Sequence, residues 1–145
     1  MQPVTCPISR EVDVYVAIGR GRELAAAIGF DDIDRTRIEI VILELTRNIL
    51  AHAGRGELIL EAIEQNGRKG IVIEARDRGP GIIDIELAMR DGYSTANTLG
   101  AGLPGVKRLM DEFEITSEVG VGTRARATKW LENRRSRTWV GGRRS

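Results

Sequence analysis

The sequence predicts an α/β two-layer sandwich, with helices packed on one face of a mostly antiparallel mixed sheet. Three observations carry this prediction: an amphipathic helical pattern over residues 33–53, two apolar segments joined by a polar turn at 65–70, and a hairpin pattern near the C-terminus. The chain has 145 residues, a usual length for one domain and enough to bury a full core. We expect one domain over residues 1–131 and an arginine-rich tail over 132–145.

Two interpretations compete over residues 11–28. The valines between residues 12 and 16 alternate as in a strand, whereas the apolar residues 24–28 suit a helix. Two glycines inside this segment would each weaken a helix by about 1 kcal/mol relative to alanine. We favour a helix that ends at Gly29 in the left-handed conformation, with Ser9 as its N-cap.

The segment 33–53 has a clear helical period. Its apolar residues recur at three- and four-residue spacing: Ile38, Val41, Ile42, Leu45 and Ile49. Gly54 is expected to end this helix. Strands are expected over residues 3–9, 58–63, 71–75, 113–119 and 123–130, and short helices near 84–89 and after Pro104. We expect the strand at 58–63 to be buried on both faces, or nearly so.

Composition points to a cytoplasmic protein without a membrane span. No apolar run reaches the roughly 18 residues that a span requires, and the single cysteine, Cys6, cannot form an internal disulfide. The net charge is +1, yet residues 133–145 hold five arginines and no acid, which leaves −4 for the remainder. A basic tail can bind nucleic acid, but aromatics are few and not interleaved with basic residues, so we favour a solvated terminus and no nucleic-acid partner.

Glu44 and Asn48 are one helical turn apart and therefore lie on the same side of the predicted helix. With His52 they fall on one shoulder of the apolar stripe, where a carboxylate and an amide could face a ligand. The amide oxygen of Asn48 suits magnesium, and the Glu44 carboxylate could accept a proton from an attacking hydroxyl. Taken alone, without the segments that follow, the pair is more typical of a solvated helix edge.

Glycine-rich segments follow in a fixed order. Asp77 comes directly after a predicted strand and could accept a hydrogen bond from an exocyclic amine, while Gly79 and Gly81 allow a sharp turn against a flat base. In isolation, the same residues are those of a simple turn. Near the C-terminus, Gly122 and Thr123 could place a hydroxyl against the base, although a hairpin turn is the simpler interpretation.

A second glycine-rich segment, residues 100–105, precedes a predicted helix. The residues that would present backbone donors to phosphate are Gly100, Ala101, Gly102, Leu103 and Gly105. The segment is not a Walker A loop, because no Lys-Ser/Thr pair follows its last glycine. It is not a dinucleotide fingerprint either, because the strand and acid of that motif are absent around it.

The order of these motifs resembles the GHKL (Bergerat) ATPase and kinase superfamily over residues 4–131. In that superfamily the helix carrying Glu44 and Asn48 is the N box, and the two glycine-rich segments are the G1 and G2 boxes. The resemblance implies that ATP and Mg²⁺ bind, with Asn48 on magnesium, Glu44 as general base, Asp77 on the adenine amine and Thr123 supporting the base.

As a compact domain, the chain resembles the bacterial anti-sigma-factor and switch-protein serine kinases, most closely those of the RsbT type of the stressosome, on the segment 94–113. This resemblance implies phosphorylation of STAS-domain scaffold and antagonist proteins, and activation of a PP2C-type phosphatase after release. Two alternatives stay open: an anti-sigma factor that sequesters a sigma subunit, and a nucleotide-gated binding switch. The arginine-rich tail departs from the family pattern.

Overall fold

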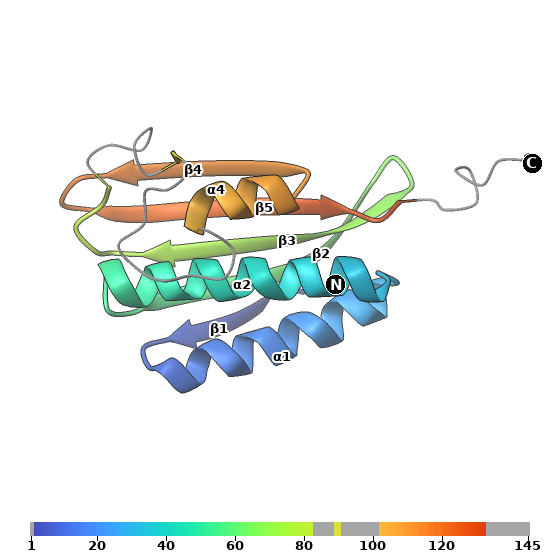
Figure 1. Ribbon diagram of the computed structural model, residues 1–145, viewed down its shortest axis with the longest axis horizontal. Coiled ribbons are helices and arrows are strands. Elements are labelled where there is room, and N and C mark those ends of the chain that lie inside the picture. The colour runs from blue at the N-terminus through green and yellow to red at the C-terminus, as the bar shows by residue number, and fades with distance from the viewer. Residues whose placement is uncertain (1, 83–88, 91–101, 133–145) are drawn as a thin grey trace, which may run out of the picture.

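The computed structural model describes residues 2–82, 89–90 and 102–132. Its elements in chain order are β1 (Val4–Ile8), α1 (Glu11–Ile28), α2 (Asp32–His52), β2 (Gly56–Gln65), β3 (Arg68–Asp77), α4 (Gly102–Leu109), β4 (Glu112–Glu118) and β5 (Gly122–Trp130). The five strands form one sheet in the order β1-β2-β3-β5-β4, and all four described pairings are antiparallel. The helices lie together on one face of this sheet (Figure 1), so the two-layer α/β sandwich is confirmed.

Both long helices form as predicted, with one difference at a cap. Gly29 ends α1 at φ 115°, and its amide donates to the Ala25 carbonyl. The N-cap of α1, however, is Arg10 and not Ser9. Asp13 explains the difference, because its carboxylate accepts hydrogen bonds from both the Ser9 and Arg10 amides at 2.9 Å. The first turn is thus capped from inside the helix.

The β2–β3 hairpin is longer than its apolar segments. Asn66 and Gly67 adopt φ angles of 53° and 78°, the geometry of a two-residue turn with left-handed central residues. Such a turn lets pairing continue to its edges, so β2 runs to Gln65 and β3 starts at Arg68. At its other end β3 extends to Asp77, which is therefore the last strand residue and does not lie in a following loop.

The two faces of the sheet differ in burial. Side chains that point to the helices form the core, among them Leu58, Leu60, Ile71, Ile73, Ala125 and Ala127. Alternate residues point to the other face, which no described helix covers; we call it the open face. The prediction that 58–63 is buried on both faces is therefore wrong in part, because Ile59 and Ile63 are only half-buried on the open face.

The C-terminal helix begins earlier than expected. Gly102, Leu103 and Gly105 lie within the first turns of α4, not in a loop before it. Pro104 is tolerated there because the first turn lacks internal amide hydrogen bonds. The predicted helix near 84–89 and the tail beyond 132 fall outside the described residues, apart from Met89. Among the described helices, none combines the length and apolarity needed to cross a lipid bilayer.

Candidate functional site

Three of the elements that carry the predicted site meet at one end of the sheet, and a fourth, α4, points toward that end. Helix α2 ends beside the segment after β3, since a Cβ placed on Gly79 would lie 2.6 Å from the Ala53 Cβ. The last residue of β3, Asp77, pairs with Thr123 at the start of β5. The C-terminal end of α4 lies at the opposite end of β5, where Lys129 Nζ donates to the Leu109 carbonyl at 3.2 Å. The N-terminus of α4 therefore points toward the Thr123 end (Figure 1).

The polar stripe of α2 shows a gradient of exposure. Glu44 is 0 % exposed, Asn48 is half-buried, and His52 is exposed at the helix end. A solvated helix edge would leave all three in water, so the structure excludes that interpretation for Glu44. Because a carboxylate is rarely buried without a specific reason, its position one turn before Asn48 keeps this part of α2 as the candidate site.

Asp77 has a defined conformation. Its Oδ1 accepts a hydrogen bond from the Gly79 amide at 2.9 Å, which turns the chain directly after β3. The strand alternation that places Ile73 and Ala75 in the core also places Asp77 on the helix side of the sheet. A ligand between the sheet and α2 would therefore meet the second carboxylate oxygen, an acceptor for an amine.

Close packing requires glycine at two positions after Asp77, namely Gly79 and Gly81. A Cβ on Gly79 would overlap Ala53 at the end of α2. Gly81 has φ +81°, and its Cβ would lie 2.6 Å from the Glu118 carbonyl oxygen. Both residues thus hold the 79–81 segment against α2 and β4. Sequence reasoning assigned them to contact with a flat base, and the described residues add this packing role.

Thr123 forms part of a hydroxyl pair. Its Oγ1 lies 2.8 Å from the Ser117 Oγ, and Ser117 in turn accepts from the Ile82 amide at 2.7 Å. Ser117 was missed by sequence reasoning. Its signal is a polar residue at the helix-facing position of a strand whose two earlier helix-facing residues, Phe113 and Ile115, are apolar. The pair ties the start of β5 to the segment after Asp77.

The start of α4 is anchored in the core. Leu103 and Val106 are 8 % and 0 % exposed and pack into the main hydrophobic cluster, while Gly102 has φ +70°. The amides of the first turn lack helical partners and carry the positive end of the helix dipole, so they favour an anion. Gly100 and Ala101, predicted phosphate contacts, lie outside the described residues.

The donor set fits a nucleotide with magnesium. Asp77 and the hydroxyls of Ser117 and Thr123 lie at the end of the sheet beside the end of α2, while Asn48 and Glu44 precede the last residue of that helix by four and eight positions. Within residues 2–82, 89–90 and 102–132, no three His, Cys, Asp or Glu side chains gather to hold a metal ion. Magnesium at Asn48 would therefore take its other ligands from phosphate and water, as this ion commonly does.

Residues 9–129 match the histidine kinase-like ATPase domain family, and the chain belongs to that family. The match confirms the predicted GHKL fold. Within this class the chain is 50% identical over 124 residues to serine/threonine-protein kinase RsbT of Bacillus subtilis, covering 86% of this chain and 93% of that protein. The predicted resemblance to the RsbT-type kinases is thus also confirmed.

Two more distant similarities point the same way. The chain is 33% identical over 99 residues to an anti-sigma F factor of Thermoanaerobacter, which is 65% of this chain and 68% of that protein. The structure of the RsbU and RsbW domains of Rv1364c from Mycobacterium tuberculosis superposes with a TM-score of 0.64 at 18% identity. It covers 91% of this chain, which spans 34% of that longer chain, and shows the shared fold.

Proposed function

We propose that the protein is an ATP-dependent protein serine/threonine kinase. The observation that carries the proposal is Glu44, fully buried on α2 one turn before Asn48, on the helix whose end lies beside the segment after Asp77. A protein that only bound nucleotide would have no use for a buried base at this position. The 50% identity to a serine/threonine-protein kinase supports the same activity.

Each predicted site residue has a role in this proposal. Asp77 accepts from the adenine amine, and Thr123 supports the base together with Ser117. Gly79 and Gly81 shape the backbone beside the base. The first turn of α4, with Gly102, Leu103 and Gly105, binds phosphate together with Gly100 and Ala101. Asn48 contributes its amide oxygen to Mg²⁺, which when bound would neutralise phosphate charge.

In the transfer step, Glu44 takes the proton of the acceptor hydroxyl as its oxygen bonds to the γ-phosphorus. The bond from that phosphorus to the β–γ bridging oxygen breaks, and ADP leaves with the electron pair. Phosphoryl transfer of this kind depends mainly on positioning and on electrostatic stabilisation. Burial of Glu44 keeps bulk water from the carboxylate that must orient the hydroxyl.

The acceptor and the partners are also part of the proposal. We infer that the substrates are STAS-domain scaffold and antagonist proteins, and that the released kinase binds and activates a PP2C-type phosphatase in the cytoplasm. Neither nucleic acid nor membrane is expected as a partner. The identity to RsbT over 93% of that protein's length supports these assignments.

Direct sequestration of a sigma subunit is the second candidate. It is favoured by the 33% identity to the anti-sigma F factor, which is lower and covers less of the chain than the similarity to RsbT. Retention of a sigma factor, but not of a STAS-domain protein, on the immobilised chain would favour this candidate. A nucleotide-gated switch without transfer is the third.

Phosphotransfer to a STAS-domain protein from the same genome tests the kinase directly. Glu44→Gln preserves the shape of the side chain and removes the base, so transfer should fall by about 100-fold or more while nucleotide affinity stays unchanged. His52→Ala, at the exposed end of the same stripe, is the control and should retain activity. Equal losses of nucleotide affinity and transfer in Glu44→Gln would refute the role of Glu44 as base.

The role of Asn48 is tested by titrating magnesium. Asn48→Ala removes the amide oxygen, so the gain in ATP affinity that Mg²⁺ produces should shrink by about tenfold. One polar contact of this kind contributes on the order of 1–2 kcal/mol. Binding of metal-free ATP should change little. An unchanged magnesium dependence would rule out Asn48 as a ligand.

A further inference from the structure

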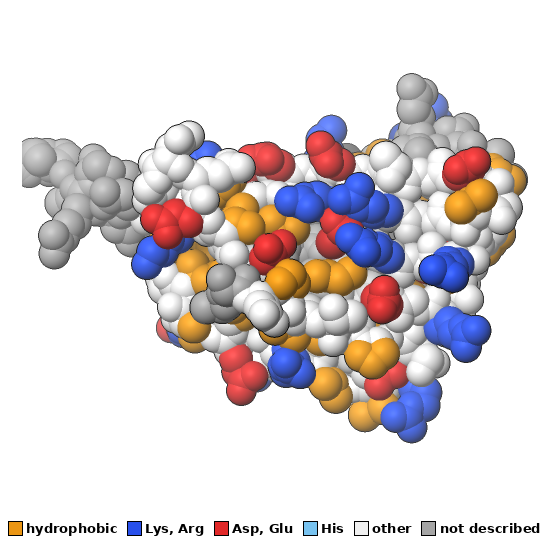
Figure 2. Space-filling view, turned by 180° about the vertical axis from the view of Figure 1, so that it is seen from behind, with side chains coloured by type: hydrophobic (Ala, Val, Ile, Leu, Met, Phe, Trp, Pro, Cys, Tyr) orange, Lys and Arg blue, Asp and Glu red, His pale blue; other side chains and the backbone are white. Residues whose placement is uncertain are grey.

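The open face of the sheet carries a carboxylate enclosed by arginines. Glu74 on β3 is 3 % exposed although no described helix covers it. Arg124 Nη2 and Arg126 Nη1 on β5 lie 3.0 and 3.4 Å from its Oε1, and Arg76 Nε donates to its Oε2. The arginine side chains themselves are 40–55% exposed. Figure 2 shows Lys and Arg side chains gathered over the middle of this face.

Glu74 fixes the positions of these three arginines, and its single negative charge does not neutralise all of them. Burial alone would raise the pKa of Glu74, but hydrogen bonds from Arg124 and Arg76 hold it below its ordinary value, so the carboxylate stays ionised at neutral pH. Glu114, which pairs with Arg126 between β4 and β5 and also acts on Arg124, supplies a second negative charge, so the three guanidinium groups still outnumber the carboxylates by one. Each guanidinium has five N–H donors in a fixed fork, and the contacts with Glu74 use only part of them.

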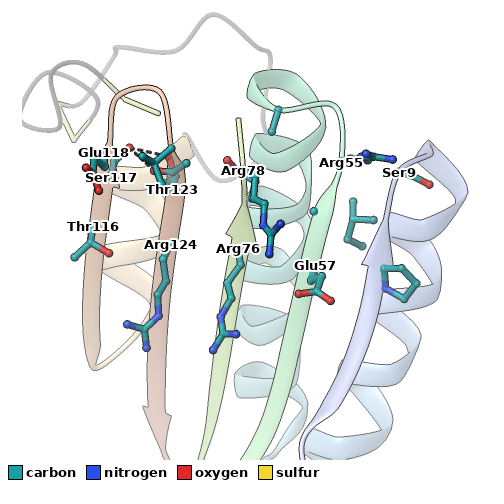
Figure 3. A pocket seen from close by; sticks show the side chains of 17 residues that line it. Ser9, Arg55, Glu57, Arg76, Arg78, Thr116, Ser117, Glu118, Thr123 and Arg124 are labelled. Atoms are coloured by element: carbon teal, nitrogen blue, oxygen red, sulfur yellow. Dashed lines mark hydrogen bonds between the residues drawn. The ribbon is translucent and has the colours of Figure 1, made fainter. Parts of the chain in front are cut away.

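A cavity of about 960 Å³ lies beside this cluster at the Asp77 end of the sheet, and its lining includes Ala53, Asp77, Ser117 and Thr123. Arg76 and Arg124 line it together with two arginines that do not belong to the Glu74 cluster, Arg55 and Arg78. In Figure 3 the side chains of Arg76, Arg78 and Arg124 lie on the same side of the sheet. The hydroxyls of Ser9 and Thr116 and the carboxylates of Glu57 and Glu118 complete the polar lining.

The charges favour an anion with several acceptor oxygens. Four arginines line the cavity against the carboxylates of Glu57, Glu118 and Asp77, and that of Asp77 is turned to the Gly79 amide. Guanidinium forks bind phosphate in bidentate fashion, with shorter and stronger hydrogen bonds than neutral pairs. The cavity is also larger than one phosphate group, so it has room for the molecule that carries it.

We propose that the arginine-lined part of this cavity is a second binding site, which takes a phosphate group through Arg78, Arg55 and the outward donors of Arg76 and Arg124. It adjoins the candidate nucleotide site, because Asp77, Ser117 and Thr123 line the same cavity. The phosphate could be carried by a phosphorylated protein segment or be a small free anion, and both share this chemistry. The site does not depend on the kinase activity proposed above.

The test measures binding to the full chain in saturating Mg·ADP, so that phosphate-bearing probes do not enter the nucleotide site. Calorimetry with a phosphoserine peptide, its unphosphorylated form and inorganic phosphate should show binding of the first, the third or both, but not of the second. Binding of the phosphoserine peptide alone identifies a protein-borne phosphate as the ligand, and binding of inorganic phosphate alone identifies a small anion.

Arg78→Ala is the decisive variant, because Arg78 lines the cavity without contacting Glu74, and its loss should leave the fold intact. Arg78→Ala should weaken phosphate binding about tenfold or more, and Arg55→Ala should weaken it further when combined. Arg20→Ala on α1 is the matched exposed control and should bind as the unmodified chain does. No binding by any phosphate probe, or equal binding by Arg78→Ala, would leave the cluster as a structural salt-bridge network and overturn the proposal.

Discussion

Strand β3 presents two different chemistries on its two sides. Toward the helices it places Ile71, Ile73 and Ala75, all in the main core. On the open face, one residue away each time, it places Glu74 and Arg76 within a charged cluster. Both faces bury side chains of β3, but the helix side does so with apolar contacts alone, whereas the open side buries Val72 beside the ion-paired Glu74. The apolar side provides the stability that positions the candidate nucleotide site, and the open side provides charge at a surface.

Truncating an apolar side chain on each face should give the largest difference in unfolding free energy. Ile73→Ala removes a fully buried side chain from the core, so unfolding free energy should fall by about 2–5 kcal/mol. Ile59→Ala, on the open face and half-buried, should cost about 1 kcal/mol, because water can occupy part of the space. Urea unfolding of both variants measures the difference. Equal losses would mean that the open face is packed as tightly as the core.

The sequence predicts the helix side well, and the open side poorly, for a physical reason. Apolar periodicity identified α2, and the glycine-rich segments located Asp77 and Thr123, because local chemistry determines these features. The cluster around Glu74 depends on the register between β3 and β5, which opposes Glu74 to Arg126 and Arg76 to Arg124. Register is a tertiary property, and an alternating charged strand alone is typical of any solvated face.

Ser117 illustrates the same limit within the candidate site. Its contact with Thr123 joins residues on two strands, and its contact with Ile82 spans 35 residues of sequence. Capping of α1 differs from the prediction on a smaller scale, since Ser9 is a common N-cap type but Asp13 competes for the same amides. Residue type predicts the chemistry available, whereas the fold decides which groups meet.

Gly122 packs closely against the backbone at the end of β3. Its substitution should cause the next largest loss of unfolding free energy. A Cβ there would lie 2.1 Å from the Asp77 carbonyl oxygen, and φ is +151°. Gly122→Ala should therefore cost about 3 kcal/mol in unfolding free energy and weaken nucleotide binding, since Asp77 must shift. Urea unfolding and nucleotide titration measure the two effects.

Gly120→Ala is the control within the same turn. Its φ is +83°, but a Cβ would meet no atom within 4 Å, so only the left-handed conformation is penalised, at about 1 kcal/mol. Nucleotide affinity should be unchanged in this variant. If Gly120→Ala lowered nucleotide affinity as much as Gly122→Ala does, the effect would arise from the turn as a whole and not from the contact with Asp77.

The charge cluster around Glu74 should make the smallest contribution to the free energy of unfolding, and this contribution should depend on pH. The arginines hold the pKa of Glu74 below its value in the unfolded chain, although burial opposes them. A lowered folded-state pKa stabilises the protein above the unfolded pKa, and that contribution is lost as pH falls through the folded value. Because the arginines are about half exposed, we expect about 1 kcal/mol at neutral pH, which Glu74→Gln should remove.

Unfolding free energies between pH 7 and pH 3 distinguish this contribution from others. The unmodified chain should lose stability below about pH 4.5, the ordinary pKa of a glutamate, and Glu74→Gln should lose less over the same interval. Some acid dependence should persist, because hydrogen bonds from the Ser9 and Arg10 amides also lower the pKa of Asp13. Parallel curves for the two proteins would mean that Glu74 contributes nothing through its charge, and the open face would then differ from the helix face only in polarity.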